Sequence, residues 1–178
     1  MGADLRRTGA GTYVSTSPEA TIELGRILGT LLGADDLLIL TGDLGAGKTQ
    51  LTKGVARGMG VADEVTSPTF NIEVTHEGAE TDLHHFDLYR LDDASQLGDA
   101  GVYDALDGDG PCLVEWGEAF ADELGDERVD VTLERLDDEV AANVEPPRSI
   151  TFEPHGTEAT RLVLSLDAAF DATICKES

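Results

Sequence analysis

Cysteine is scarce in this sequence and long apolar runs are missing, and each shortage argues against a class of protein. The 178 residues include only Cys112 and Cys175, which lie far apart and show no Cys-x-x-Cys or Cys/His spacing. A disulfide framework or a zinc site is therefore not expected, and a reducing cytoplasm fits the composition. No apolar run approaches the length of a membrane span, and residues 1–10 lack the core of a signal peptide. We therefore expect no membrane association.

Positive charge is also scarce. Lysine and arginine number 12 against 36 aspartates and glutamates, so the formal net charge is −24, and the only lysines are Lys48, Lys53 and Lys176. Such a surface repels phosphate backbones, so strong direct binding of nucleic acid by this chain is not expected. The acidity has two interpretations: a solvated surface that keeps the protein dissolved, or adaptation to a salty cytoplasm, where screening weakens self-repulsion. The acids are spread along the chain and not gathered in a tail, which favours the second interpretation.

One of the three lysines belongs to the most informative motif of the chain. Residues 42–49 read Gly-Asp-Leu-Gly-Ala-Gly-Lys-Thr, the G-x-x-x-x-G-K-T pattern of the phosphate-binding P-loop. Its glycines allow successive N–H groups to face an anion, Lys48 can reach the β- and γ-phosphates, and Thr49 can coordinate Mg²⁺. An apolar run at residues 37–40 precedes the loop, and Leu51, Val55 and Met59 follow at helical spacing. Strand, loop and helix therefore come in the order of a nucleotide site; the alternative is a plain glycine-rich turn with a surface lysine.

The rest of the chain alternates strand-like and helix-like segments, without an internal repeat or a domain linker. Residues 1–11 are expected to be a loose lead-in, Ser17 and Pro18 to begin a helix, and residues 157–170 to form a closing helix. Short helices are expected within residues 92–107, and strands at 12–16, 35–41, 69–75, 81–89, 112–115, 128–136 and 148–153. The third and fourth of these strands are expected to pair as a hairpin, and the last two as another. The length suits a single domain over residues 1–178.

Glu115 is the second candidate site residue. It follows the apolar run of residues 112–114, where P-loop proteins place the acid that holds or orients Mg²⁺. The usual acid there is aspartate, and the alternative is an exposed carboxylate at a strand end. The only tryptophan, Trp116, could stack on a base or a partner, but a lone tryptophan is more often a core residue.

Polar residues alternate along the strand expected at residues 81–89. His85, Asp87 and Tyr89 share one face, and Phe86 and Leu88 share the other. Beside a nucleotide site the polar face could position water, which makes Asp87 a candidate base or water-orienting group. An outward, half-solvated polar face fits the spacing equally well.

Three weaker signals remain. Arg90 could stabilise a transferring phosphate, but a structural ion pair is favoured. The hydroxyl-rich stretch at residues 66–70, Thr-Ser-Pro-Thr-Phe, could sense the γ-phosphate, although the residues alone favour a plain proline turn. Asp107-x-x-Gly110 precedes its strand and no Asn-Lys-x-Asp sequence exists, so a GTPase interpretation is weak.

Taken together, these motifs resemble those of one family. The P-loop, residues 66–70, the segment His-Phe-Asp-Leu-Tyr-Arg-Leu at residues 85–91, and Glu115-Trp116 stand in the order and spacing of the TsaE (YjeE) family, small bacterial ATPases of tRNA threonylcarbamoyladenosine synthesis. The resemblance runs from Ser17 to Phe170, and the three motifs behind the P-loop are the specific ones. The chain departs from the family pattern at Gln50, where threonine is frequent, and at Gly117, where proline is frequent.

The resemblance implies a P-loop NTPase fold of the α/β class, with three layers and a mixed, mainly parallel central sheet that has antiparallel additions. It implies Mg²⁺-dependent hydrolysis of ATP in the cytoplasm, in support of a TsaB–TsaD-type pair that transfers threonylcarbamoyl to tRNA. This chain would then reset that complex and meet tRNA only indirectly. By motif match, Lys48, Asp87 and Glu115 are catalytic, and Thr49 and Glu115 hold the metal. The implied nucleotide contacts are Gly42, Asp43, Leu44, Gly45, Ala46, Gly47, Lys48, Thr49, Gln50 and Trp116. Residues 66–70 become a switch candidate.

Two other classes of function stay open. A P-loop kinase for a small metabolite would need a lid with basic residues, of which this chain has few. A nucleotide-gated assembly module would bind ATP with negligible turnover. Measuring phosphate release with and without a partner complex separates both from an ATPase.

Overall fold

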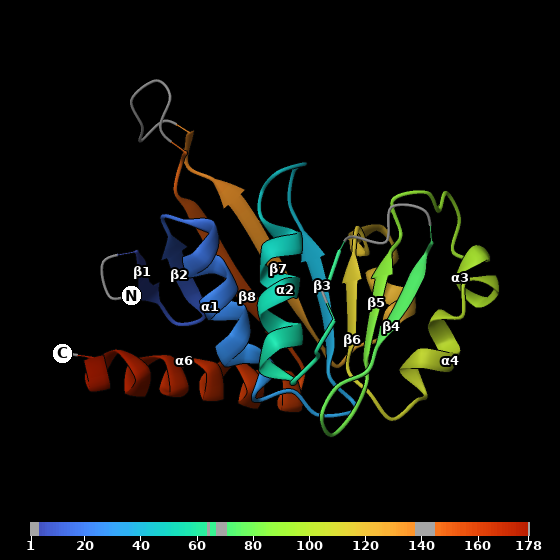
Figure 1. The fold of residues 1–178 in the computed structure, drawn as a ribbon. Helices are drawn as coiled ribbons and strands as arrows, with labels where there is room; N and C mark the ends of the chain where they lie inside the picture. Colours follow the sequence, from blue (N-terminus) through green and yellow to red (C-terminus); the bar gives the residue numbers. More distant parts are fainter. Residues whose placement is uncertain (1–3, 64, 67–70, 138–144, 178) are drawn as a thin grey trace.

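The computed structural model describes residues 4–63, 65–66, 71–137 and 145–177 (Figure 1). Within these residues, eight strands form one sheet with helices packed against it. The strands are β1 (Leu5–Gly9), β2 (Thr12–Ser15), β3 (Leu37–Thr41), β4 (Glu73–His76), β5 (Leu83–Asp87), β6 (Cys112–Glu115), β7 (Arg128–Arg135) and β8 (Arg148–His155). The helices are α1 (Pro18–Gly29), α2 (Lys48–Gly58), α3 (Gln96–Asp99), α4 (Val102–Leu106), the short 3₁₀ helix η1 (Glu118–Phe120), α5 (Ala121–Leu124) and α6 (Thr157–Glu177).

The sheet has a parallel centre and antiparallel edges. Its strand order is β1-β2-β8-β7-β3-β6-β5-β4. β3 pairs in parallel with β7 and β6, and β6 with β5, whereas the other four pairings are antiparallel. The α/β class, the mixed sheet and both expected antiparallel pairs are confirmed. Four pairings are antiparallel and three are parallel. The antiparallel strands at the edges therefore form a larger part of the sheet than was expected.

Two hydrophobic cores lie on opposite faces of the central strands. Because side chains alternate along a strand, Leu38 and Leu40 of β3 enter one core, and Leu37 and Ile39 enter the other. The first core contains residues of α1, α2 and α6, and the second contains residues of α3, α4, η1 and α5. Figure 1 shows α1 and α2 in front of the sheet, with α6 running below them. The centre of the molecule therefore has the expected three layers.

The helix that carries the P-loop is fixed against α1 by direct backbone contact. A Cβ placed at Gly54 would lie 2.0 Å from Ile22 O, and one at Gly29 would lie 2.1 Å from Val55 O. A Cβ placed at Gly25 or at Gly58 would likewise lie 2.3 Å from a carbonyl oxygen of the facing helix. Only glycine permits such an approach. The position of α2, and with it the P-loop, therefore depends on four glycines.

The structure corrects some boundaries. Residues 1–11 were expected to be loose, but they contain β1. This strand pairs with β2, and its Leu5 is fully buried. β4 begins at Glu73, later than expected, and α6 continues beyond Phe170 because Ile174 prolongs its apolar face one turn later. Ser17 does cap α1, since its Oγ accepts a hydrogen bond from Ala20 N at 3.2 Å. No helix in the part of the chain that the structure describes is long and apolar enough to cross a membrane.

Candidate functional site

The loop between β3 and α2 has the backbone of a phosphate cradle. Gly42, Gly45 and Gly47 have positive φ angles of 151°, 82° and 111°. Gly42 also faces β7 closely, because a Cβ there would lie 2.4 Å from Leu133 O. Helix α2 begins at Lys48, and no side chain caps its N-terminus. A helix start with uncapped N–H groups attracts anions, so this loop is suited to bind phosphate.

Lys48 is held inside the site by the loop and by an aromatic ring. Its side chain is buried, and Nζ donates hydrogen bonds to Gly42 O and, at 3.3 Å, to Asp43 O. Nζ also lies 4.1 Å from the centroid of the Trp116 ring, within the range of a cation–π contact. Burial lowers the pKa of Lys48, and the nearby carboxylates, Glu115 first, act in the opposite direction. The ammonium group is therefore partly desolvated.

Trp116 has an unusual backbone. Its φ of 61° makes it the only residue other than glycine with a positive φ among the described residues. Its N–H donates to Leu40 O at 3.2 Å, and its ring lies 5.2 Å from the ring of Tyr89. Strained conformations of this kind are found preferentially at functional sites. The interpretation of Trp116 as a core residue is wrong, because its half-buried side chain lines the cavity described below.

Glu115 and Asp87 lie side by side at the carboxyl ends of two parallel strands. The two residues are Cα partners in the β5–β6 register. Glu115 is 3% exposed, so it is not an exposed strand-end carboxylate. Its Oε1 lies 3.0 Å from Nε2 of His85, which is completely buried. Asp87 is half-buried, and its Oδ1 accepts a hydrogen bond from Tyr89 N at 3.0 Å.

The core to which Leu83 belongs shows which way the polar face of β5 points. Leu83 shares this face and belongs to the core that contains α2. His85 and Asp87 therefore point toward the side of the sheet on which the P-loop helix packs. The alternative of an outward, half-solvated face is wrong at His85. Tyr89, just beyond the strand, is 71% exposed.

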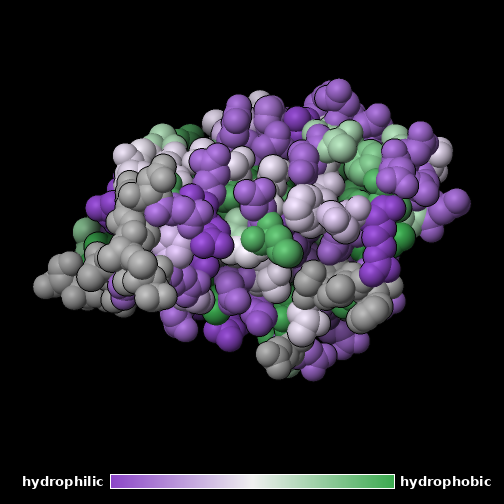
Figure 2. Space-filling model, turned by 90° about the horizontal axis from the view of Figure 1, so that it is seen from above, coloured by the Kyte–Doolittle hydropathy of each residue, from purple (hydrophilic) through white to green (hydrophobic). Residues whose placement is uncertain are grey.

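A cavity of about 740 Å³ collects these groups, within the range of small-molecule sites. Nine of the sequence-predicted residues line it: Leu44, Gly45, Gly47, Lys48, Thr49, Gln50, Asp87, Glu115 and Trp116. Gly42, Asp43 and Ala46 do not line it, and their carbonyl oxygens instead accept hydrogen bonds from Lys48 and Arg148. Figure 2 views the molecule from above, the side toward which the loop between β3 and α2 projects in Figure 1, and shows a largely hydrophilic surface with isolated apolar spots.

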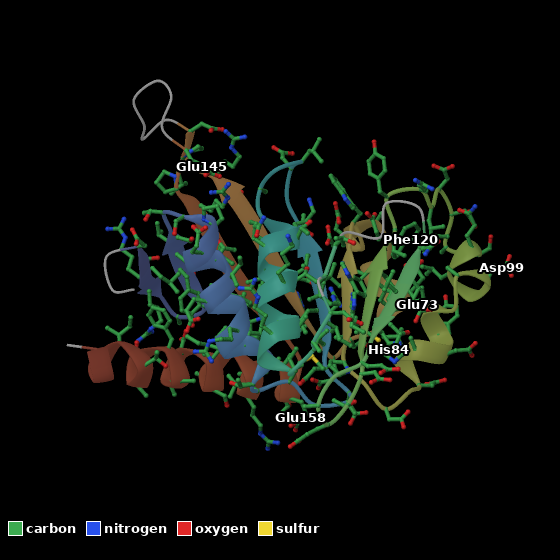
Figure 3. All side chains as sticks on the ribbon, in the orientation of Figure 1. Glu73, His84, Asp99, Phe120, Glu145 and Glu158 are labelled. Carbon is green, nitrogen blue, oxygen red and sulfur yellow. The ribbon has the colours of Figure 1, made fainter. Side chains whose placement is uncertain are left out.

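Part of the cavity lining was not foreseen. It includes Pro18, Glu145 and Arg148, and Figure 3 shows Glu145 at the upper end of the molecule. Arg148 is buried; its Nε donates to Ala46 O at 3.1 Å, and its Nη2 lies 2.5 Å from Glu145 Oε1. No motif marks Arg148 in the sequence, because its contact with the P-loop spans 102 residues.

Two weaker candidates have no assigned place in this site. Four residues of the proposed switch, Ser67, Pro68, Thr69 and Phe70, lie outside the described residues, and Thr66 is exposed. Arg90 is exposed and does not line the cavity.

The donor set fits a magnesium ion that arrives with a nucleotide. Within the described residues, no group of three or more His, Cys, Asp or Glu side chains could hold a metal alone. Mg²⁺ rarely uses an all-protein cage and prefers one or two carboxylates together with phosphate oxygens and water. The cavity offers the Glu115 carboxylate and the Thr49 hydroxyl beside the P-loop.

Comparisons with known proteins agree with these features. The family model described as "Threonylcarbamoyl adenosine biosynthesis protein TsaE" matches residues 15–144. The chain is 40% identical over 125 residues to the tRNA threonylcarbamoyladenosine biosynthesis protein TsaE of Treponema pallidum (strain Nichols), covering 70% of this chain and 92% of that protein. It is 37% identical over 142 residues to the protein of the same name from Bacillus subtilis (strain 168), covering 80% and 84%.

The similarity in structure extends further along the chain than the family model. The crystal structure of Bacillus subtilis YdiB superimposes with a TM-score of 0.70 at 29% identity, covering 92% of this chain and 96% of YdiB. The similarity in fold therefore reaches beyond residue 144 into the segment that contains β8 and α6.

Proposed function

The chain belongs to the TsaE family, and from this premise we propose that it is a Mg²⁺-dependent ATPase that acts in the cytoplasm with a TsaB–TsaD-type complex in the formation of threonylcarbamoyladenosine in tRNA. The observation that carries the proposal is one cavity that joins the P-loop lysine, two acidic residues on adjacent parallel strands and the hydroxyl of Thr49. This is the set of groups that binding and hydrolysing a nucleoside triphosphate requires.

Phosphate binding falls to the P-loop and the start of α2. The N–H groups at the uncapped helix start would donate to the anion, and the macrodipole favours negative charge there. Lys48 supplies the cation for the terminal phosphates, which requires it to exchange its contacts with Gly42 O and Trp116 for phosphate oxygens. Arg148 donates to Ala46 O and so braces the loop from β8.

Hydrolysis falls to the two acidic residues. Glu115 and Thr49 would hold the magnesium ion, which supplies positive charge beside the phosphate oxygens when it is bound. Asp87 is the Cα partner of Glu115 and lines the same cavity, so we assign it the orientation of the attacking water or the acceptance of its proton.

Charge favours an indirect role toward tRNA. A net charge of −24 opposes close approach to a phosphate backbone, so the partner proteins would hold the tRNA. Hydrolysis in this chain would then reset the partner complex between rounds of transfer, and the transfer itself would take place on the partner.

The experiment that tests the proposal measures phosphate release from ATP by the full chain, with and without a TsaB–TsaD-type complex. We expect release that stops when magnesium is chelated and when Lys48 is replaced by alanine. If the wild-type chain binds ATP but releases no phosphate, both with and without the partner complex, the nucleotide-gated assembly module is favoured instead. Transfer of the γ-phosphate to a small metabolite would favour the kinase, although the only cationic side chains among the described residues that line the cavity are Lys48 and Arg148.

A further inference from the structure

His85 and Glu115 form a buried pair behind the catalytic wall of the cavity. The imidazole is completely buried and the carboxylate is 3% exposed. His85 Nε2 lies 3.0 Å from Glu115 Oε1, a normal hydrogen-bond distance. An ionised carboxylate can only accept, so in the Nε2–H tautomer His85 donates this bond to Glu115.

This bond is the one polar contact of the His85 ring within the described residues. The other ring nitrogen, Nδ1, is buried and has no hydrogen-bond partner there. A buried polar atom without a partner lowers the stability of the fold. A histidine that only filled space would therefore be less stable at this position than an apolar residue of similar size. Among the residues that the structure describes, the His85 ring makes its hydrogen bond with Glu115 alone.

The surroundings fix the direction of the ring. His85 of β5 lies opposite Leu113 of β6, and Leu113 is two residues before Glu115. The side chains of His85 and Glu115 therefore meet diagonally across the parallel pair. On the other side, the ring of His76 of β4 lies 5.9 Å from the His85 ring, tilted by 32°. Nε2 of His76 is buried and has no hydrogen-bond partner among the described residues, so it makes no bond to Glu115.

We infer that His85 is a positioning residue that holds one oxygen of Glu115, so that the carboxylate presents its other oxygen to the metal. This inference rests on the proposed function and names a residue that acts through Glu115 without touching the nucleotide. Without the bond, the buried carboxylate would be left with Lys48 as its nearby cation. A Glu115–Lys48 ion pair would withdraw both groups from metal and phosphate.

The test compares three variants of the full chain. His85→Phe keeps a buried ring and removes the donor, and His85→Gln keeps an N–H donor near the position of Nε2. His76→Phe is the matched control, because it removes a neighbouring buried imidazole that does not touch Glu115. ATP binding is followed at increasing Mg²⁺ concentration by the fluorescence of Trp116, the only tryptophan, and by calorimetry. Thermal unfolding is recorded for each variant.

In His85→Phe we expect the Mg²⁺ concentration for half-maximal ATP binding to rise about 10-fold or more, the usual effect of losing a partner of a metal ligand. ATP binding without metal should change little. His85→Gln should restore most of the magnesium dependence, and His76→Phe should resemble the wild type.

The contrary results separate two failures. An unchanged magnesium dependence in His85→Phe, or an equal shift in His76→Phe, would overturn the positioning role while leaving the proposed function intact. A wild-type chain that releases no phosphate from ATP at any Mg²⁺ concentration, with or without the partner complex, would overturn the proposed function and the positioning role together.

Discussion

The ammonium group of Lys48 lies over the ring of Trp116, 4.1 Å from the ring centroid. The P-loop lysine and the residue after Glu115 are therefore in contact, although 68 positions separate them in the sequence, from 48 to 116. Lys48 also donates to Gly42 O, so its donors are engaged within the protein. In the proposed function, phosphate binding would replace these contacts and so would couple the arrival of nucleotide to the position of Trp116.

Replacement of Lys48 by alanine should abolish ATP binding, because the γ-phosphate loses the only cation of the P-loop. Calorimetry measures the affinity directly, and the emission of Trp116 should no longer respond to ATP. Lys53→Ala is the matched control, since it removes a lysine from the same helix that does not line the cavity. ATP affinity that survives unchanged in Lys48→Ala would refute the P-loop assignment.

The metal site should depend on Thr49 and Glu115. Thr49→Val removes a hydroxyl ligand, and Glu115→Gln removes the charge while keeping an acceptor for His85. Both variants should lose Mg²⁺-dependent hydrolysis more than binding of metal-free nucleotide. Glu118→Gln is the control, because it removes an equal charge near Lys48 from a residue that does not line the cavity. Turnover of Glu115→Gln that matches the wild type at limiting Mg²⁺ would contradict the metal role.

Asp87 should contribute to the chemical step and not to binding. Asp87→Asn keeps the side-chain oxygen that accepts the Tyr89 N–H, but it removes the proton-accepting charge. Turnover should fall by about 10²–10⁴-fold, the usual contribution of a general base, while ATP still binds. Single-turnover hydrolysis measures this step, with the exposed Asp92→Asn as control. If the two variants hydrolyse ATP equally fast, Asp87 has only a structural role.

The sequence was sufficient where chemistry is local. The spacing of Gly42, Gly47 and Lys48 dictates a phosphate loop, and alternation along β5 placed Asp87 and His85 on one face. It was insufficient where contact depends on register: Asp87 meets Glu115 only because β5 and β6 pair in parallel with that alignment. Arg148 reaches the P-loop only because β8 lies beside β7, which no local pattern reveals.

Two features of the fold were not predicted from the sequence. Gly25-x-x-x-Gly29 and Gly54-x-x-x-Gly58 have the spacing that brings helix backbones together, but no contact between these helices was predicted from it. β1 was missed because Arg6, Arg7 and Thr8 show no apolar alternation. Tertiary contacts hold this edge strand, such as the ion pair between Arg7 and Asp171 at 2.5 Å.

The glycine contact between α1 and α2 should be intolerant of a methyl group. In Gly54→Ala the new Cβ would lie 2.0 Å from Ile22 O, so the helices must separate. Alanine improves helix propensity by about 1 kcal/mol over glycine, but overpacking costs about 1–3 kcal/mol or more, and we expect the loss to dominate. Thermal unfolding should show a Tm several degrees lower than in the wild type. Gly98→Ala in α3, whose Cβ would lie 3.8 Å from Tyr103, should leave Tm unchanged or raise it. Equal Tm values for the two variants would show that α1 and α2 can move apart freely.

The acidic surface should make stability depend on salt. The cause is mutual repulsion among 36 acidic residues that only 12 basic residues offset, and at about 1 M salt the Debye length falls to roughly 3 Å. Salt also weakens exposed ion pairs such as Arg161–Glu158, but each of these contributes little, so relief of repulsion should dominate. Tm should therefore rise as KCl is raised from dilute buffer into the molar range. Sulfate also strengthens hydrophobic burial through its exclusion from the protein surface, so a rise in sulfate alone would not indicate screening. A Tm that stays flat or falls in KCl would leave the acidity as ordinary solubilisation and remove the support for a salty cytoplasm.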